Sequence, residues 1–385
     1  MGVVAINPAK KFTFWILVSS FLINHSFSQE LLKGQTKTKL LLNAYTQDGN
    51  EGSQIYDNSN DEEVEVIEPM LFIEHQISET TNLSGNFIVD AFSSASDTKL
   101  DGKTGTSGAG IGWQSRYSGS LGISNDHHPW KWGASLGYSG EWDYRSKNVG
   151  LFGERSLAED NFKIGLSLNA YFDQTKLFDI DKQSAITWKD RNIYSATLSL
   201  SQLLTVKDSI SGGYTYVVQK GALENISNTV LASGSRTAEI LPNKRARHSL
   251  FTTYAHAWSY DLANHMELMY YKDDWDLSAW SVGPSMLFSF LDDKAFLKGS
   301  YRFYSQKKSK YFAKSFNSAQ TAMTSDSDLG GFHSDRFGVH FSYDFSESVF
   351  NQFFERFEYT LSYFHYERSN QLHYDLVQTS LGVTF

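Results

Sequence analysis

Residues 131–172 read KWGASLGYSGEWDYRSKNVGLFGERSLAEDNFKIGLSLNAYF, and apolar and polar side chains alternate through both ends of this stretch. From Phe162 to Phe172 every second residue is apolar, and the residues between them are small, polar or amphipathic. Successive side chains of a strand point to opposite faces, so the pattern predicts a strand with one apolar and one polar face. A helical period fits neither end. An outward apolar row ending in aromatics, with small polar residues facing inward, is typical of a membrane β-barrel strand.

The same alternation recurs along the chain and predicts about 16 strands, with 14 and 18 left open. The long links fall at every second connection, at 48–62, 93–115, 174–191, 221–246 and 305–336. Bacterial barrels have an even strand number, short periplasmic turns and longer external loops, so both termini are expected in the periplasm. We therefore predict an all-β fold, a transmembrane antiparallel up-and-down β-barrel. Its predicted strands lie near 37–47, 64–77, 83–92, 116–125, 131–142, 148–157, 162–172, 192–204, 209–220, 247–259, 265–271, 279–291, 295–304, 337–345, 357–366 and 374–385.

The first residues indicate an exported protein. Lys10 and Lys11 precede an apolar run at 12–23 that is too short to span a bilayer as a helix, and small residues follow at Ser26 and Ser28. We predict a cleaved signal peptide at 1–28 and a barrel at 29–385, and the alternative is an uncleaved anchor helix. The predicted location is the outer membrane of a Gram-negative cell, with outer-membrane lipid around the barrel.

Composition supports the barrel and excludes several classes of function. Aromatic residues make up 15% of the chain, with 28 Phe and 21 Tyr, yet the mean hydropathy is negative. Amphipathic strands explain this combination, because half of each strand can stay polar. The chain has no Cys, which removes disulfides, thiolate metal sites and a Cys nucleophile. Its net charge of -9, concentrated in predicted loops, argues against a nucleic-acid partner.

The C-terminus carries a separate signal. An outward row ends on an aromatic residue, at Val377, Thr379, Leu381, Val383 and Phe385. This row resembles the terminal-strand signal that the barrel assembly machinery reads, so that machinery is an expected partner. The alternative is a soluble β-sandwich that ends on Phe by chance.

Several segments resemble a known family. They are SGEWDYRS at 139–146, FKIGLSLNAYFDQ at 162–174, LPNKRARH at 241–248, MYYKDDWDL at 269–277, YRFYSQ at 301–306 and TSDSDLGGF at 324–332. In this order they resemble domain of unknown function 3570, an uncharacterised barrel family of Bacteroidetes and Proteobacteria. The resemblance implies a barrel and no established activity. It also implies genes for a flavin-attaching enzyme and a small lipoprotein nearby, and hence a lipoprotein partner in a redox-linked surface complex.

Ionisable residues fall on the predicted inward row. They are Glu141, Asp143, Arg145, Lys163, Glu267, Lys298, Arg302, His340 and Asp344. One interpretation is a solvated or salt-bridged wall, which is ordinary for barrels. The other is a pair of opposed acidic and basic walls whose transverse field selects polar solutes.

A second group lies at a short external turn. Asp273 and Asp274 belong to this turn, and Arg302 lies on the neighbouring hairpin, so a bidentate carboxylate–guanidinium pair that anchors the loop is expected. We predict no metal site and no cofactor, because adjacent residues such as His127 and His128 point apart in an extended segment. No catalytic residue is assigned.

Three functions follow from these observations. The first is a channel for small polar solutes, constricted or plugged by the loops 221–246 and 305–336. The second is a non-conducting scaffold for a lipoprotein or a surface complex, because aromatic residues anchor interfaces and are frequent in and near the loops, at Trp275, Trp280, Tyr304, Tyr311, Phe312 and Phe316. The third is an enzyme at the barrel rim that uses Asp273, Asp274 and Arg302.

Overall fold

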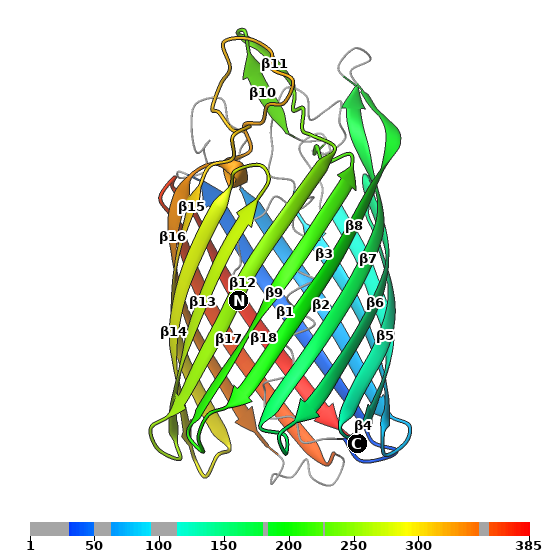
Figure 1. Ribbon diagram of the computed structural model, residues 1–385, viewed down its shortest axis with the longest axis vertical. Coiled ribbons are helices and arrows are strands. Elements are labelled where there is room, and N and C mark those ends of the chain that lie inside the picture. The colour runs from blue at the N-terminus through cyan, green and yellow to red at the C-terminus, as the bar shows by residue number, and fades with distance from the viewer. Residues whose placement is uncertain (1–30, 50–62, 94–113, 180–183, 226–227, 346–353) are drawn as a thin grey trace.

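The protein is a closed antiparallel β-barrel of sixteen strands (Figure 1). The computed structural model describes residues 31–49, 63–93, 114–179, 184–225, 228–345 and 354–385. The first barrel strands are β1 (Thr36–Gly49), β2 (Val64–Gln76), β3 (Thr81–Phe92), β4 (Gln114–His127), β5 (Trp130–Gly140), β6 (Tyr144–Leu157), β7 (Phe162–Asp179), β8 (Ser184–Leu203) and β9 (Asp208–Gly221). The others are β12 (Lys244–Ala257), β13 (Leu262–Asp273), β14 (Ser278–Phe290), β15 (Ala295–Lys307), β16 (Phe332–Asp344), β17 (Arg356–Arg368) and β18 (Leu372–Thr384).

The first and last strands close the barrel. β1 pairs with both β2 and β18, and the backbone N–H groups of Thr36 and Phe385 each donate to the other residue's carbonyl, at 2.7 and 3.0 Å. Figure 1 shows the C-terminus and the short turns at one end of the barrel, and the hairpin β10 (Thr229–Ala232) and β11 (Ser235–Ala238) beyond the other. We call these the turn end and the outer end. All neighbouring strands pair antiparallel, and the closed order leaves no strand of the barrel at a free edge.

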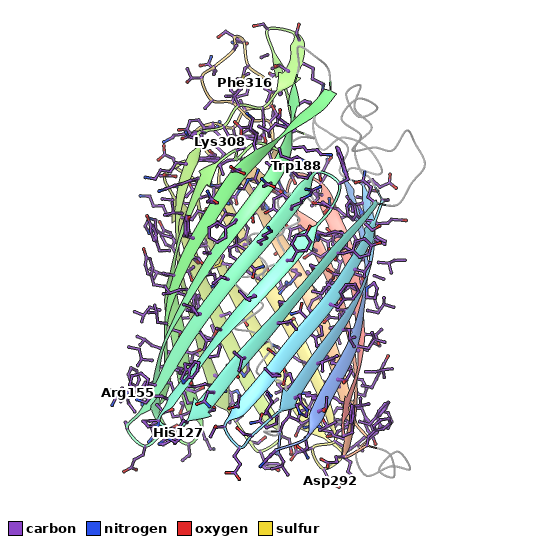
Figure 2. The ribbon with its side chains drawn as sticks, turned by 90° about the vertical axis from the view of Figure 1, so that its right-hand side faces the viewer. His127, Arg155, Trp188, Asp292, Lys308 and Phe316 are labelled. Carbon is purple, nitrogen blue, oxygen red and sulfur yellow. The ribbon has the colours of Figure 1, made fainter. Side chains whose placement is uncertain are left out.

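The two faces of the wall differ as the sequence predicts. Large apolar side chains point outward and are exposed, with Leu121 at 74% and Leu136 at 65%, while the neighbouring inward residues Ser118 and Ser139 are buried. Figure 2 shows this outer layer of side chains along the length of the barrel. Lipid replaces water around a membrane barrel, so an apolar outer layer is the face that suits contact with lipid. The outward positions of Val377, Leu381 and Phe385 on the last strand match the prediction.

All sixteen predicted strands are present, but two predicted loops were partly wrong. The predicted loop 174–191 is mostly strand, because β7 and β8 continue their pairing beyond the neighbouring strands to Asp179 and Ser184. The predicted loop 221–246 contains the β10–β11 hairpin. Both segments lie beyond the neighbouring strand ends, and apolar alternation does not mark them because no lipid faces them. The link 305–336 has no further strand but includes the short 3-10 helix η2 (Ser327–Leu329).

The predicted signal peptide, residues 1–28, lies outside the described residues, as does most of the predicted loops 48–62 and 93–115. Among the residues that the structure describes, no helix is long and apolar enough to cross a membrane.

Candidate functional site in the barrel lumen

The inward face of the strands lines the lumen and carries six of the nine predicted ionisable residues, and Glu141 and Asp143 lie in the β5–β6 turn. Arg145 is the exception, and its assignment to the lumen was wrong. It points outward from β6, between the buried Tyr144 and Ser146, and its guanidinium lies 4.4 Å from the ring centre of Trp188. The turn before β6 contains three residues, so inward residues are odd-numbered on β5 and even-numbered on β6. The sequence prediction kept the odd-numbered residues inward beyond this turn and therefore placed Arg145 in the lumen.

The outer half of the lumen is filled by large side chains. Tyr366 is 4% exposed and Tyr374 is not exposed at all, although both point into the barrel. Their rings stack at 4.5 Å, and Tyr45 on β1 adds a third ring 5.1 Å from Tyr374. A large side chain on a single-layer wall becomes this buried only when other groups, from the wall or from the links at its outer end, cover it. Further large inward residues that are buried are Tyr171, Tyr304, Arg191, Arg245, Arg336 and Arg368.

The turn end of the lumen is more open. Lys163, on the inward face of β7, has a side chain that is 47% exposed, and the inward Phe152 is 40% exposed. The middle of the wall between these levels is lined largely by small residues, among them Ser135, Gly150, Ser167, Ser195, Thr197 and Ser199. Large buried inward side chains are therefore concentrated in the outer half of the lumen, which we call its narrow region.

Carboxylates gather on one side of this narrow region. Glu68 on β2 accepts a 2.6 Å hydrogen bond from Asn43, and Asp90 on β3 is buried and forms a salt bridge with Arg116. Glu141 and Asp143 in the β5–β6 turn continue the group, and Asp173 on β7 ends it. The Oδ1 atoms of Asp90 and Asp173 are buried without a hydrogen-bond partner. This acidic side extends over β2 to β7.

The β5–β6 turn brings two of the predicted residues into this acidic side. Asp143 is 5% exposed, and its carbonyl accepts a 2.8 Å hydrogen bond from the Lys176 backbone, while Glu141 is half-buried. Burial raises the pKa of the Glu141 carboxyl to about 8, opposed by the charge of Arg116 and reinforced by Asp143 and Asp90. Burial also raises the pKa of the Asp143 carboxyl to about 6.

Asp273 binds Arg245 and not the predicted Arg302. Its Oδ2 accepts hydrogen bonds from Nε of Arg245 at 2.8 Å and from the Tyr271 hydroxyl at 2.9 Å. Its Oδ1 accepts from the backbone N–H groups of Trp275 and Leu277, each at 3.0 Å. The side chain is fully buried, so this carboxylate holds the β13–β14 turn against β12.

Asp274 has a separate and more exposed position. Its Oδ1 accepts a 3.1 Å hydrogen bond from the Ala246 backbone, and its carbonyl accepts from Nζ of Lys310 at 2.8 Å. Arg302 lies deeper in the barrel and donates to Ser281 Oγ at 2.9 Å. The structure does not bring Asp273, Asp274 and Arg302 together, which removes the arrangement that the rim-enzyme hypothesis required.

Basic residues gather on the opposite side of the lumen. Inward positions on β12 and on β15 to β17 carry Arg245, Arg247, Lys298, Arg302, Arg336 and Arg368. In the closed strand order, β15 and β16 lie half-way round from β5 and β6. The basic side therefore faces the turn that carries Glu141 and Asp143 across the lumen.

Two long links build an ordered cap at the outer end. Leu223 and Leu241 from the β9–β12 link pack with Leu329 from the β15–β16 link and with Trp275 and Leu277 of the β13–β14 turn. Figures 1 and 2 show β10–β11 and Phe316 above the ends of the strands. The described parts of these links lie at and above the rim, and their predicted role as a plug stays a prediction.

Polar contacts join the two links as well. Thr324 Oγ1 donates to Glu239 Oε2 at 2.8 Å, and Asn228 Nδ2 donates to Asp326 Oδ2 at 3.2 Å. Arg368, whose side chain is fully buried, bonds to Asp328 at 2.7 Å and fixes the cap to β17. The cap is thus attached to the wall at more than one strand.

The aromatic residues that suggested an interface have other roles. Trp275 and Tyr304 are buried, and Trp280 points outward from β14 in the apolar layer at 49% exposure. Tyr311, Phe312 and Phe316 are partly buried and pack against clusters of the cap. Aromatic content therefore gives no support to a binding surface, and the scaffold hypothesis stays a prediction on other grounds.

Sequence reasoning missed several residues of the narrow region. Asp90 lies within a correctly predicted strand on its inward row, so the alternation itself could have identified it. Arg245 and Arg336 lie just before the predicted strands that began at 247 and 337, so their inward direction could not be assigned. Within the part of the chain that the structure describes, no three His, Asp or Glu residues form a group that could hold a metal ion.

The closed barrel with an outward apolar layer defines the class of the protein: it is a porin-like β-barrel of the Gram-negative outer-membrane type. The chain belongs to the family described as protein of unknown function (DUF3570), whose family model matches residues 22–380. No curated protein sequence matches the chain.

Solved outer-membrane structures are similar in fold. A structure titled bacterial polysaccharide outer membrane secretin has a TM-score of 0.51 at 9% identity, covering 90% of this chain and 98% of its own. The outer membrane protein opdK from Pseudomonas aeruginosa has a TM-score of 0.44 at 8% identity, covering 91% and 98%. OccAB4 from Acinetobacter baumannii has a TM-score of 0.40 at 9% identity, covering 92% and 99%. The likeness in fold rests on the first of these.

Proposed function

We propose that the protein is a constricted outer-membrane channel for small polar solutes, exported by a cleaved signal peptide at residues 1–28. The observation that carries this proposal is the burial of Tyr366 and Tyr374 inside the lumen, at 4% and 0% exposure. A barrel of about 16 strands is wide enough for an aqueous channel, so side chains that meet within it decide the size of what passes.

The charge distribution supports selection of polar solutes. Carboxylates dominate β2 to β7, and guanidinium and ammonium groups dominate the far side at β12 and β15 to β17. Opposed charges across a narrow, partly desolvated passage produce a transverse field that orients dipolar and zwitterionic solutes. Apolar solutes gain nothing from this field.

Liposome swelling tests the proposal. Wild type and a Tyr366→Ala/Tyr374→Ala variant would be reconstituted and exposed to neutral sugars of increasing size. The variant should admit larger sugars than wild type, because truncation removes the rings that fill the outer half. The matched control is Tyr363→Ala, on the outward face of β17. Equal entry of large sugars in wild type and variant would refute a side-chain constriction.

The ordered cap favours a second candidate, a scaffold for a lipoprotein partner. The cap presents a fixed surface beyond the rim, because the β9–β12 and β15–β16 links are joined by Thr324–Glu239 and Asn228–Asp326 contacts. Affinity purification of the full chain in mild detergent distinguishes the two candidates. A stoichiometric partner that is lost when residues 228–239 are replaced by a short linker supports the scaffold, and recovery of the barrel alone supports the channel.

A further inference from the structure

Two arginines lie directly opposite each other on neighbouring strands inside the lumen. Arg302 on β15 is the register partner of Arg336 on β16, and both point inward. Side chains at such positions have Cβ atoms about 4.5–5.5 Å apart, and like charges there destabilise the pair. Arg336 is also 8% exposed, so water screens little of the repulsion.

Neither arginine forms a direct salt bridge with a carboxylate in the part of the chain that the structure describes. Arg302 donates to Ser281 Oγ at 2.9 Å and lies 3.9 Å from the Met269 sulfur. The inward arginines that do form salt bridges are Arg116, Arg245, Arg356 and Arg368, with Asp90, Asp273, Asp344 and Asp328. Arg302 and Arg336 are not among them, and neither are the inward Arg191 and Arg247. Arg191 and Arg247 each lie opposite an aspartate in the strand register, whereas Arg302 lies opposite Arg336.

Uncharged groups position Arg336. Its guanidinium carbon lies 5.3 Å from the ring centre of Phe364, and a guanidinium N–H donates a hydrogen bond to the Tyr374 hydroxyl. The Phe364 ring lies against Gly338, where an added Cβ would come within 2.6 Å of it. The glycine thus leaves room for the Phe364 ring beside the Arg336 guanidinium.

The surrounding charge is positive overall. Lys298 and His340 are register partners two inward positions closer to the turn end. Glu267 on β13 supplies opposite charge, and its carboxylate interacts electrostatically with Lys298, Arg302 and Arg336. One carboxylate faces three permanent cations in this group, so an additional anion would be favourable.

We infer that Arg302 and Arg336 form a binding site for the oxyanion of a small solute, a carboxylate or a phosphate, at the narrow part of the lumen. The planar guanidinium group matches the two oxygens of such an anion and binds them bidentately. Two adjacent guanidinium groups neutralised by one oxyanion relieve their own repulsion. The inference deepens the proposed function, because it requires that solutes enter the lumen.

Thermal unfolding of the full chain in detergent tests the site without measuring transport. The protein would be heated in sodium chloride, and then with part of the chloride replaced by inorganic phosphate or by acetate at constant ionic strength. A ligand that binds only the folded protein raises the unfolding midpoint with its concentration. Wild type should show this rise, and Arg302→Gln and Arg336→Gln should each bind the anion at least tenfold more weakly.

Two comparisons make the result specific. Lys163→Gln removes an inward cation at the open turn end and should keep the full response. In plain chloride, Arg302→Gln should unfold at a higher temperature than wild type, because the variant removes like-charge repulsion. A rise in the unfolding midpoint with phosphate alone would indicate that the site binds phosphorylated solutes. A rise with both phosphate and acetate would indicate that it binds carboxylates as well.

Other outcomes overturn the inference. An equal rise in wild type and in both arginine variants would show a general salt effect, and no rise with either anion would show that no site exists. The outcome is distinguishable from failure of the proposed function. Anion binding without sugar entry into liposomes would reject the channel and support the anion site. Sugar entry without anion binding would support the channel and reject the anion site.

Discussion

Asp273 is a fully buried carboxylate whose two oxygens are both occupied, by Arg245 and Tyr271 on one side and by backbone N–H groups on the other. Removing one partner of a buried ion pair leaves the other charge uncompensated, which costs about 3–5 kcal/mol. We expect Asp273→Asn to lower the unfolding midpoint and to expose the β13–β14 turn to protease.

The control for this prediction is Asp274→Asn. Asp274 is exposed at the same turn, and a surface substitution there should change stability by about 0.5 kcal/mol or less. Equal effects of the two substitutions would show that Asp273 does not anchor the turn. Arg302→Gln should leave protease sensitivity of the turn unchanged, since Arg302 bonds to Ser281 instead.

The stability of the barrel should depend on the ionisation of Glu141. The unfolded chain loses this proton near its ordinary pKa of about 4.3, whereas burial keeps it on the folded protein up to about pH 8. The folded state binds more protons between these values, so its stability falls as pH rises through this window. Glu141→Gln should flatten the fall in unfolding midpoint, measured by heat-dependent gel mobility. An unchanged pH slope in this variant would contradict the assignment.

At the scale of elements, the cap depends on contacts between links that are far apart in sequence. Leu329 packs with Leu223 and Leu241 from the other link and with Trp275 of the turn. Truncating a buried Leu to Ala costs about 2–5 kcal/mol and leaves a cavity. We expect Leu329→Ala to increase hydrogen exchange in both 222–243 and 308–331 while the strands stay protected.

Lys308→Ala provides a comparison in the same link, because Lys308 is exposed at the rim (Figure 2). It should leave exchange in 222–243 unchanged. Faster exchange in 308–331 alone after Leu329→Ala would show that the two links fold independently, and the cap would then be no single unit.

The strands were predictable because lipid imposes one rule on every outward face. The alternation around Leu121, Leu136 and Leu381 has a period of two, and no core packing interrupts it. Apolar alternation is not required where a strand extends beyond the lipid bilayer. It therefore missed the extension of β7 and β8 and the β10–β11 hairpin, and it misplaced Arg145 when a three-residue turn exchanged the inward and outward rows.

The site was less predictable than the fold, for a physical reason. Apolar alternation predicts which side chains point into the lumen, but it does not predict which of those side chains contact one another. Asp273 was expected to meet Arg302 on a neighbouring hairpin, and it meets Arg245 on the strand before it. That choice depends on register and height, because Arg245 lies at the outer end of β12 and Arg302 lies lower on β15.

For the whole molecule, we propose that the lumen narrows from the turn end toward the outer end and that charge separates across its narrow part. Exposed Lys163 and Phe152 mark the open end, and buried Tyr366 and Tyr374 mark the narrow one. Solutes from outside would meet the cap first and the charged constriction next. The proposal makes the wall side chains, and not the described cap, the main barrier.

Single-channel conductance in planar bilayers tests this central claim most directly. Wild type, a variant with residues 228–239 replaced by a short linker, and Tyr366→Ala/Tyr374→Ala would be compared in the same salt. We predict a small conductance in wild type, little change after removal of the hairpin, and a clear increase after truncation of the tyrosines. A large wild-type conductance that the tyrosine truncation leaves unchanged would contradict the account, as would a conductance that rises only when the hairpin is removed.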